Sequence, residues 1–472
     1  MTRNNYYITT TLPYVNAEPH IGFALEIVQA DAVARYHRLL GENVFFNFGT
    51  DEHGLKIYRK ALEANKDPQE YSDEYAAKYD DLKKALNLSY DNFIRTTDDH
   101  HIKAAQEFWK LCDENGDIHK KNYKTKYCVG CELEKTDSEL VDECCPTHPT
   151  LKLEIIEEEN YFFKFSKYQD ALLKLYKENP DFVIPGFRQK EIATFVSEGL
   201  QDFSISRLKE KLPWGIPVPG DPKHVMYVWF DALINYISAI GWPEDKKKFE
   251  KWWPVVQVAG KDNLRQQSAI WQAMLLSAGL SPSKQILIHG FISSGGQRIS
   301  KSLGNVVDPY ELVDKYGTDA LRYYLLAKTH PFRDSDFTIE KFESTYNADL
   351  ANGLGNLVAR VSGLAKGLSI KSDDDNKHLA DKNAANALNK YKFNLALKAI
   401  WKEIRKLDVY INKNKVWELD GTEKKDAATH LVKGVRNIAF DLKPFLPETA
   451  ETIEKKLSGE IKPAKPLFPR LD

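Results

Sequence analysis

The first fifty residues combine two apolar runs with one long amphipathic stretch. Residues 6–11 form a β-branched and aromatic run that predicts a strand, and residues 44–48 predict a second, buried strand. Between them, apolar residues recur at roughly helical spacing from about His20 to Leu40, and Gly41 ends the stretch. A strand, a helix and a strand in this order imply a parallel sheet with a right-handed crossover.

The same alternation returns further along the chain. Residues 255–258 and 285–289 each predict a strand, and the apolar spacing from about residue 264 to residue 279 predicts a helix between them. The intervening region, about 112–224, differs in character, with a cysteine cluster, acidic and aromatic segments, and Pro and Gly positions near its end. We interpret this region as a domain inserted into a split nucleotide-binding fold.

Strand patterns stop at about Ile339. From there, helical patterns with Lys-rich faces continue to Leu446, which predicts a C-terminal helical bundle. The predicted fold class is therefore α/β, with a split Rossmann-type parallel sheet, an inserted domain and a C-terminal all-α bundle.

Composition narrows the class of protein without identifying a partner. The chain of 472 residues is long enough for several domains, and its 66 Lys and Arg nearly balance its 68 Asp and Glu. Net charge therefore does not predict nucleic-acid binding, which would need a local basic surface. No apolar stretch approaches the roughly 20 residues of a membrane helix. The strand pattern begins at Tyr6 and leaves no room for a targeting peptide, so we expect a cytoplasmic protein without a membrane partner.

Four of the five cysteines cluster between residues 128 and 145. Cys128-x2-Cys131 is followed by Cys145-x2-His148, and such paired knuckles suit tetrahedral zinc. Cys144 is a rival to Cys145 as the third ligand, and reduced buried cysteines are the alternative to any metal. Because four protein ligands leave no position open for a substrate, we expect a single structural Zn²⁺ ion.

The segment His20-Ile21-Gly22 stands at the predicted start of the long helix. A helix N-terminus offers unpaired N–H groups and partial positive charge, which suit a phosphate. His20 can donate to phosphate oxygens, and Gly22 would let a nucleotide approach the backbone closely. Taken alone, a histidine at a helix start is more often a structural residue.

A second segment, residues 298–302 (Arg-Ile-Ser-Lys-Ser), follows the pair Gly295-Gly296. A Gly-rich loop with two cations can clamp a triphosphate and neutralise charge as pyrophosphate departs. The segment is a near miss to the P-loop pattern, which needs Gly where Ser300 stands. Taken alone, it could equally be a solvated loop.

Together, the His-Ile-Gly segment and the Ser-Lys-Ser loop resemble the paired signatures of class I aminoacyl-tRNA synthetases. Six further segments resemble the methionyl-tRNA synthetase family: 11–16 (TLPYVN), 49–54 (GTDEHG), 159–163 (ENYFF), 229–232 (WFDA), 260–262 (GKD) and 317–323 (GTDALRY). The likeness runs from about Tyr6 to Arg470. It implies ATP-dependent activation of L-methionine to methionyl-adenylate, followed by transfer to tRNA(Met) for translation.

The resemblance also implies roles for individual residues. Catalytic contacts to the phosphates are expected from His20, Gly22, Arg298 and Lys301, and contacts to ATP from His20, Gly22, Phe23, Lys301 and Ser302. The methionine pocket is expected at Leu12, Tyr14, Asp51, Trp229, Ala232, Leu233, Tyr236 and Gln267. Asp51 would hold the substrate ammonium, and an apolar aromatic slot suits a thioether. Without the resemblance, Trp229 and Tyr236 would more often be ordinary core residues.

The family reads the anticodon with an Asn, an Arg and a Trp, and this chain has all three. Asn356 and Arg360 are four positions apart on one helix face, and Trp417 is expected on a later helix. Unpaired bases stack on aromatic rings and hydrogen-bond to Asn and Arg. Trp417 alone would more often be a packing residue. The family's knuckle also favours Cys145 over Cys144 as the zinc ligand.

The resemblance assigns the domains and the partners. The expected domains are 1–111, first half of the Rossmann catalytic domain; 112–224, inserted connective domain with the zinc knuckle; 225–290, second half; 291–345, stem-contact region with the Ser-Lys-Ser loop; and 346–472, helical anticodon-binding domain. The expected partners are L-methionine, tRNA(Met), and ATP with Mg²⁺. We expect no DNA partner, and we expect a monomer because the chain ends just past the bundle.

Three positions depart from the family pattern. Phe23 replaces the second histidine of His-Ile-Gly-His, which removes a polar group near the ATP. Gln267 replaces a pocket histidine; it donates and accepts hydrogen bonds but cannot be charged, and we hypothesise that it changes how methionine seats. Arg298 replaces a Lys, which keeps the charge but changes the geometry.

Two alternatives deserve comparison. Class I synthetases for branched aliphatic residues carry an editing insertion longer than the inserted region here, and the cysteine and tryptophan enzymes lack this set of pocket segments. The other alternative is a catalytically impaired synthetase paralogue that acts as an RNA-binding or scaffold protein. Phe23 and Gln267 support it, whereas Asp51, Lys301 and the anticodon trio count against it.

Overall fold

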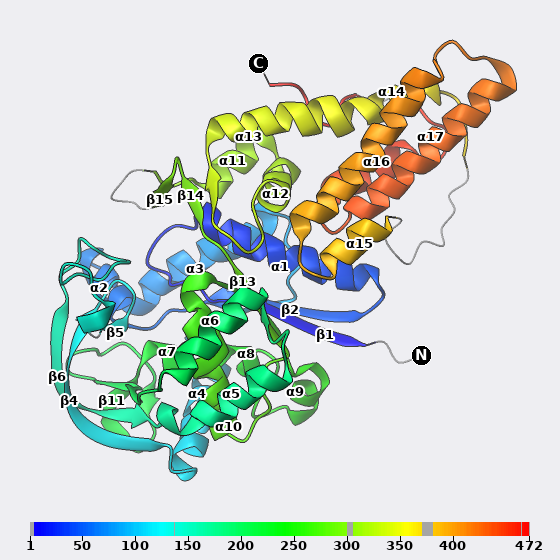
Figure 1. The fold of residues 1–472 in the computed structure, drawn as a ribbon. Coiled ribbons are helices and arrows are strands. Elements are labelled where there is room, and N and C mark those ends of the chain that lie inside the picture. The colour runs from blue at the N-terminus through cyan, green and yellow to red at the C-terminus, as the bar shows by residue number, and fades with distance from the viewer. Residues whose placement is uncertain (1–3, 136, 300–304, 371–380, 464, 472) are drawn as a thin grey trace.

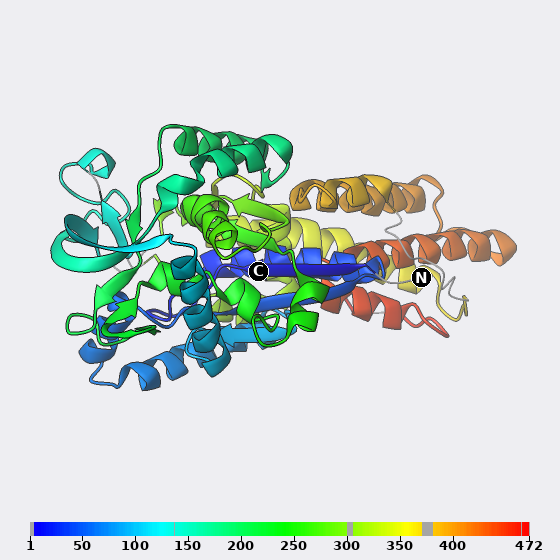
Figure 2. The same ribbon diagram turned by 90° about the horizontal axis from the view of Figure 1, so that it is seen from below.

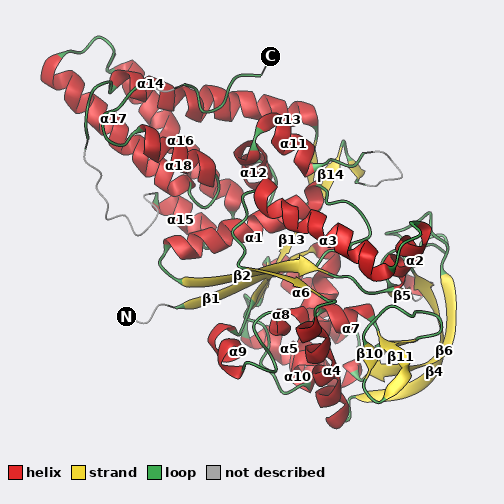
Figure 3. Cartoon of the chain, turned by 180° about the vertical axis from the view of Figure 1, so that it is seen from behind, coloured by secondary structure: helices red, strands yellow, loops and turns green. Residues whose placement is uncertain are grey.

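The centre of the molecule is a six-stranded sheet. The computed structural model describes residues 4–135, 137–299, 305–370, 381–463 and 465–471. The strand order is β3-β2-β1-β12-β13-β7, and every neighbouring pair is parallel (Figures 1 and 3). The two halves of the sheet come from separate stretches of the chain, which confirms the predicted split Rossmann-type fold.

The first half of the sheet follows the predicted strand–helix–strand order. It comprises β1 (Asn5–Thr10), α1 (Ile21–Leu39), β2 (Asn43–Thr50), α2 (Leu55–Glu63), α3 (Pro68–Ala85), β3 (Asn92–Arg95) and α4 (Asp99–Glu114). His20 is the N-cap of α1, and Gly41 follows the helix with a φ of 83°, a conformation that favours glycine. The predicted strands and helix in this region are therefore confirmed.

The second half of the sheet repeats the strand–helix–strand order. Its strands have one apolar core on each face. It comprises β12 (Val256–Gly260), the π-helical turn Gln266–Ile270, α10 (Trp271–Ser277) and β13 (Gln285–His289). On β13, Leu287 packs into the core under α1, whereas Ile286 and Ile288 pack into a second core with α4 and α10. Successive strand residues point to opposite faces, so a strand buried on both faces reads as a continuous apolar run.

The region between the two halves contains two small antiparallel sheets. Its elements are β4 (Ile118–Cys128), β5 (Leu133–Lys135), β6 (Glu154–Phe163), α5 (Gln169–Glu178), β7 (Val183–Ile184), α6 (Gly186–Ser197), β8 (Phe203–Ser204), β9 (Ser206–Leu208), β10 (Pro217–Val218) and β11 (Asp221–Met226). The sheets run β5-β4-β6-β8 and β10-β11-β9, and the long β4–β6 pair forms one edge of the molecule in Figure 1. Short β7 instead joins the main sheet beside β13. Three short helices follow: α7 (Val228–Ala232), α8 (Asn235–Ser238) and α9 (Lys246–Trp252).

A small mixed sheet and a set of helices complete the chain. They are β14 (Ile292–Ser294), β15 (Gln297–Arg298), α11 (Pro309–Tyr316), α12 (Thr318–Ala327), β16 (Ser335–Phe337), α13 (Ile339–Thr345), the π-helical stretch Tyr346–Gly355, α14 (Asn356–Leu364), α15 (Lys382–Leu388), α16 (Phe393–Lys413), α17 (Gly421–Leu442) and α18 (Pro447–Lys456). The helices from α14 onward form a bundle that extends to one side of the sheet (Figure 2). This arrangement confirms the predicted C-terminal all-α bundle. None of the described helices is both long and apolar enough to cross a membrane.

Arg322 joins the bundle to the sheet. Its side chain is fully buried, and its guanidinium lies 2.7 Å from the carboxylate of Asp31 on α1. It also donates to the carbonyl of Phe445 at 2.8 Å and to that of Leu86 at 3.0 Å. One continuous apolar core extends from the sheet through α12 into the bundle.

Candidate active site and metal cluster

A cavity of about 800 Å³ lies at the carboxyl ends of the parallel strands. Residues that follow β1, β2, β12 and β13 line it, together with α7, α8 and the start of α1. The strand order reverses between β1 and β12, and ligands of open α/β sheets bind at such a switch point. The structure brings eleven predicted site residues into this one cavity: Leu12, Tyr14, His20, Gly22, Phe23, Asp51, Trp229, Ala232, Leu233, Tyr236 and Gln267.

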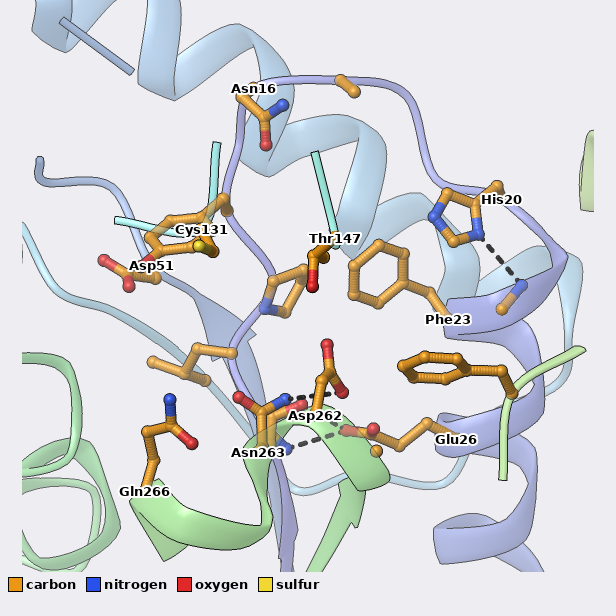
Figure 4. A pocket seen from close by; sticks show the side chains of 18 of the residues that line it. Asn16, His20, Phe23, Glu26, Asp51, Cys131, Thr147, Asp262, Asn263 and Gln266 are labelled. Carbon is orange, nitrogen blue, oxygen red and sulfur yellow. Dashed lines mark hydrogen bonds between the residues drawn. The ribbon is translucent and has the colours of Figure 1, made fainter. Parts of the chain in front are cut away.

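The beginning of α1 forms one end of the cavity (Figure 4). His20 accepts a hydrogen bond from the backbone N–H of Gly22 at 3.0 Å, so its ring folds back over the helix start. A Cβ at position 22 would lie 2.7 Å from the His20 ring, which explains the glycine independently of any nucleotide. Phe23 packs against His20, with ring centroids 4.8 Å apart, and edge-on against Tyr79. An aromatic ring thus occupies the place of the expected polar group.

Asp51 presents a buried carboxylate to the same cavity. It directly follows β2 and is 2% exposed, and its Oδ1 has no hydrogen-bond partner among the described residues. Burial raises the pKa of Asp51 well above its usual range, and the nearby carboxylates of Asp231 and Glu132 add to the rise. Such a group is stabilised by a cation, and a substrate ammonium would supply one.

The carboxylate of Asp231 stays ionised nearby. His53 lies 2.7 Å from one of its oxygens and His101 lies 2.8 Å from the other. Burial opposes ionisation, but the charge of His53 and the hydrogen bonds from both histidines outweigh it and lower the pKa of Asp231. The negative charge of Asp231 therefore adds to the demand for a cation at Asp51.

Aromatic side chains also line the cavity. Trp229 and Tyr14 meet edge to face with ring centroids 6.2 Å apart, and each has a buried polar atom with no hydrogen-bond partner in the described part of the chain. Gln267 donates to the hydroxyl of Tyr236 at 2.8 Å and accepts from Gln257 at 2.7 Å. Gln267 therefore fixes a wall residue from behind while it also lines the cavity. Its effect on methionine binding remains a hypothesis.

A pair that sequence reasoning missed closes the floor of the cavity. Glu26 accepts hydrogen bonds from the hydroxyl and backbone N–H of Thr11, at 2.6 and 2.9 Å, and lies 2.8 Å from His289. Burial alone would lower the pKa of His289, but the hydrogen bond and charge of Glu26 raise it above its usual value. The position of His289 at the carboxyl end of a predicted strand was the available signal. Asp262, within the GKD segment, also lines the cavity.

Several predicted phosphate contacts lie beyond what the structure describes. Lys301 and Ser302 fall outside the described residues, and Arg298 is described only as the end of β15. Gly296 and Ile299, which border this segment, line the cavity. The described chain therefore reaches the edge of the cavity just before this segment, and the contacts predicted for Lys301 and Ser302 stay predictions.

A possible metal cluster lies beside the cavity. The ligand atoms of Cys128, Cys131, Cys145 and His148 all lie within 4.8 Å of one another. The sulfur–sulfur distance between Cys131 and Cys145 is 3.8 Å, and the Cys128 sulfur lies 3.7 Å from the His148 nitrogen. Tetrahedral zinc with bonds of about 2.3 Å needs ligand separations of about 3.8 Å, so the geometry fits. Cys144 is not part of this cluster.

The predicted anticodon trio lies on the bundle, with one correction. Asn356 is exposed at the start of α14, and Arg360 one turn later donates to Asp408 at 2.9 Å and to Asn412 at 2.7 Å, both on α16. Trp417 is half exposed, but it lies in the turn after α16 and not on a helix as expected. The helix ends at Lys413, and Lys415 adopts a positive φ of 44° that interrupts helical geometry.

Comparisons with known proteins agree with this arrangement. The family described as class I (M) tRNA synthetases matches residues 6–153 and 147–362, and the anticodon-binding domain of tRNA ligases matches residues 377–468. The fold and the site therefore define a class I aminoacyl-tRNA synthetase. The methionine–tRNA ligase of Thermotoga maritima is 42% identical over 98% of this chain and 76% of its own length, and that of Nostoc sp. is 42% identical over 97% and 90%. The chain belongs to the methionine–tRNA ligase family.

Solved structures give the same result. The methionyl-tRNA synthetase of Mycobacterium tuberculosis in complex with methionyl-adenylate has a TM-score of 0.91 and 35% identity, covering 99% of this chain and 100% of that chain. The apo form of the same protein has a TM-score of 0.84 and 32% identity, covering 100% and 99%.

Proposed function

We propose that this protein activates L-methionine with ATP and transfers the methionyl group to tRNA(Met). The observation that supports this most directly is Asp51, a buried carboxylate that faces the cavity with one oxygen to which no described residue hydrogen-bonds. A cation is needed there, and the adjoining aromatic wall of Tyr14, Trp229 and Tyr236 suits a thioether. An amino acid with an ammonium group and a sulfur side chain satisfies both demands.

The first step needs no protein nucleophile. The methionine carboxylate attacks the α-phosphorus of ATP, the bond to the bridging oxygen breaks, and pyrophosphate leaves with methionyl-adenylate formed. Catalysis then consists of positioning and charge stabilisation. We assign the phosphates to the start of α1, at His20 and Gly22, and to the cations Arg298 and Lys301. Mg²⁺ would arrive with the ATP.

The second step brings in tRNA. The terminal ribose hydroxyl attacks the adenylate carbonyl, and AMP leaves. Asn356, Arg360 and Trp417 would read the anticodon at the bundle, where Arg360 is already oriented by Asp408 and Asn412. We propose that the region 291–345 contacts the tRNA stem and that the domain 346–472 binds its anticodon. We propose a cytoplasmic monomer, with its five cysteines unpaired as they are here.

We propose that the cysteine cluster binds a structural zinc ion and takes no part in the reaction. Cys128, Cys131, Cys145 and His148 would hold the ion in a closed tetrahedral set. The ion would link the two knuckles and supply no chemistry to the reaction. Its place is structural because all four positions are filled by protein atoms.

Substitution of adjacent cysteines tests this assignment. We expect Cys145→Ser to lower zinc affinity by at least about tenfold, because serine is a poor ligand for this metal. Cys144→Ser should retain the metal and serves as the matched control. Metal analysis after dialysis against a weak chelator measures the effect. Equal zinc content in both variants, or loss only in Cys144→Ser, would contradict the ligand set.

Lys301 tests the charge-stabilising role of the Ser-Lys-Ser loop. We expect Lys301→Ala to slow adenylate formation by about a hundredfold, because one cation near departing pyrophosphate is lost. The Kd for methionine should change little. Single-turnover kinetics and equilibrium binding separate the two quantities, and equal losses in both would argue against a transition-state role.

Methionine-dependent ATP–pyrophosphate exchange tests the function as a whole. The purified, zinc-loaded chain should catalyse exchange with methionine and not with leucine, which would also show that Phe23 is tolerated. No exchange with any amino acid, in a folded sample, would overturn the catalytic proposal and favour an RNA-binding paralogue. Aminoacylation of tRNA(Met) transcripts with an altered anticodon then tests the bundle.

A further inference from the structure

Glu132, in the zinc-knuckle region, combines a buried side chain with an unusual backbone conformation. Glu132 directly follows the predicted ligand Cys131, yet its side chain is only 1% exposed and its backbone has a φ of 52°. A buried carboxylate in a left-handed conformation is costly unless specific contacts hold it. Those contacts lie on a different part of the fold.

The carboxylate of Glu132 caps helix α2. Its Oε1 accepts the backbone N–H of Lys56 at 2.6 Å, in the first turn of the helix. The residue before α2, Gly54, makes no side-chain capping bond, so the cap comes from a residue distant in sequence. Gly54 has a φ of 106°, and a Cβ there would lie 2.9 Å from Oε1, so glycine admits the carboxylate. Lys56 also donates its Nζ to the carbonyl of Gly130 at 3.1 Å.

Two buried tyrosines hold the capping residue from behind. Tyr127 donates its hydroxyl to the other carboxylate oxygen of Glu132 at 2.9 Å, and Tyr227 donates to the backbone carbonyl of Glu132. The guanidinium of Arg207 lies 4.9 Å from the Tyr127 ring centroid and 4.8 Å from that of Tyr227. The carboxylate is therefore fixed at both oxygens, by Lys56 of α2 at one and by Tyr127 of β4 at the other.

The capped helix begins immediately after the loop that carries Asp51. Residues 51–54 link the end of β2 to α2, and Asp51 is held there by backbone hydrogen bonds to Pro13 and Val15. The knuckle also reaches the cavity itself, because Gly130, Cys131 and His148 line it together with Asp51. The 51–54 loop is thus held by the sheet at Asp51, by Arg95 and Trp214 at Glu52, and by Glu132 where it enters α2.

We propose that Glu132 is a positioning residue for methionine binding. By capping the N-terminus of α2, it holds the loop that carries Asp51 in the position that binds the substrate ammonium. The inference rests on the proposed function, since it concerns the affinity of that same pocket for methionine. Removing the carboxylate frees the first turn of α2 and lets the 51–54 loop relax. Asp51, which would bind the ammonium, is then displaced. The start of α1, which would bind the phosphates, is unchanged.

The experiment compares methionine binding and kinetics in zinc-loaded variants. Glu132→Ala should raise the Kd and KM for methionine about tenfold, the size of a lost helix cap, and Glu132→Gln should fall between it and the wild type because its amide oxygen still accepts a hydrogen bond. KM for ATP and the zinc content should stay at wild-type values. Glu143→Ala, an exposed carboxylate on the same knuckle, is the matched control and should change none of these quantities.

The outcomes separate this inference from the proposed function. No methionine binding by the wild-type chain refutes the proposed function. Wild-type binding with an equal Kd in Glu132→Ala overturns only the positioning role, and so does an equal rise in KM for methionine and for ATP. If Glu132→Ala fails to fold, Tyr127→Phe, which removes one of the two groups that fix the carboxylate, replaces it. It should raise the methionine Kd about threefold, and an unchanged Kd overturns the inference.

Discussion

Replacing Asp51 by Asn should weaken methionine binding by roughly a thousandfold, because a buried charge pair that loses one partner costs about 3–5 kcal/mol. The amide keeps the shape of the carboxylate and removes only its charge. Fluorescence titration of the purified variant with methionine measures the Kd, since Trp229 lines the same cavity. Asp113→Asn, at an exposed carboxylate on α4, is the matched control and should bind as the wild type does.

The pH dependence of the same titration sharpens the test. Burial and neighbouring carboxylates raise the pKa of Asp51, so in the free protein this group takes up a proton as the pH falls. Methionine needs the ionised form, and its affinity should therefore weaken as the pH falls through that pKa, by up to about tenfold per unit. The Asn variant should lack this dependence. A loss of less than tenfold at neutral pH, or the same pH profile in both proteins, would exclude Asp51 as the ammonium partner.

Replacing Arg322 by Ala should lower the free energy of unfolding by about 3–5 kcal/mol, because the substitution removes the fully buried one of the two guanidinium groups that pair with the buried Asp31 carboxylate. The carbonyls of Phe445 and Leu86 lose their donors as well. Urea denaturation followed by circular dichroism measures the change. Arg35 pairs with the same carboxylate at 2.7 Å but is partly exposed, so Arg35→Ala should cost far less. Equal losses in the two variants would refute the dominant role of Arg322.

The same substitution, Arg322→Ala, should also make the protein less stable at acid pH. Burial opposes ionisation of Asp31, but Arg322 and Arg35 outweigh it and lower the pKa of Asp31. A lowered folded-state pKa contributes stability above the unfolded value of about 4 and loses it as the pH falls through the folded value. Arg322→Ala removes the largest of the influences that lower the pKa of Asp31, so this pKa rises and stability should begin to fall at a higher pH than in the wild type.

Local sequence patterns predicted the parts of the fold that local forces decide. The apolar runs at β1, β2, β12 and β13 marked their strands because a strand buried on both faces shows a continuous run. His20 was placed correctly at the start of α1, since N-caps and helical periodicity act within a few residues. The eleven described residues expected around the cavity do line it, although that list came from a family likeness and not from periodicity.

Contacts between distant segments were beyond the same reasoning. Glu26 and His289 meet 263 positions apart, and Glu132 caps a helix 76 positions earlier. Neither pairing leaves a local pattern, because each depends on how separate layers pack. Short β7 joins the main sheet from within the inserted region for the same reason. The misplacement of Trp417 had a local cause, a left-handed residue at Lys415 that helical periodicity does not reveal.

The unbroken apolar core from the sheet to the bundle has a further consequence. Among the described residues, buried side chains from Ile8 in β1 to Ile453 in α18 belong to one apolar cluster, and protein cores resist compression. The span between the cavity and the exposed Trp417 turn is therefore a fixed length. Under the function proposed above, a tRNA must span that length to reach both the cavity and the bundle, so its overall dimensions would contribute to selection together with its bases.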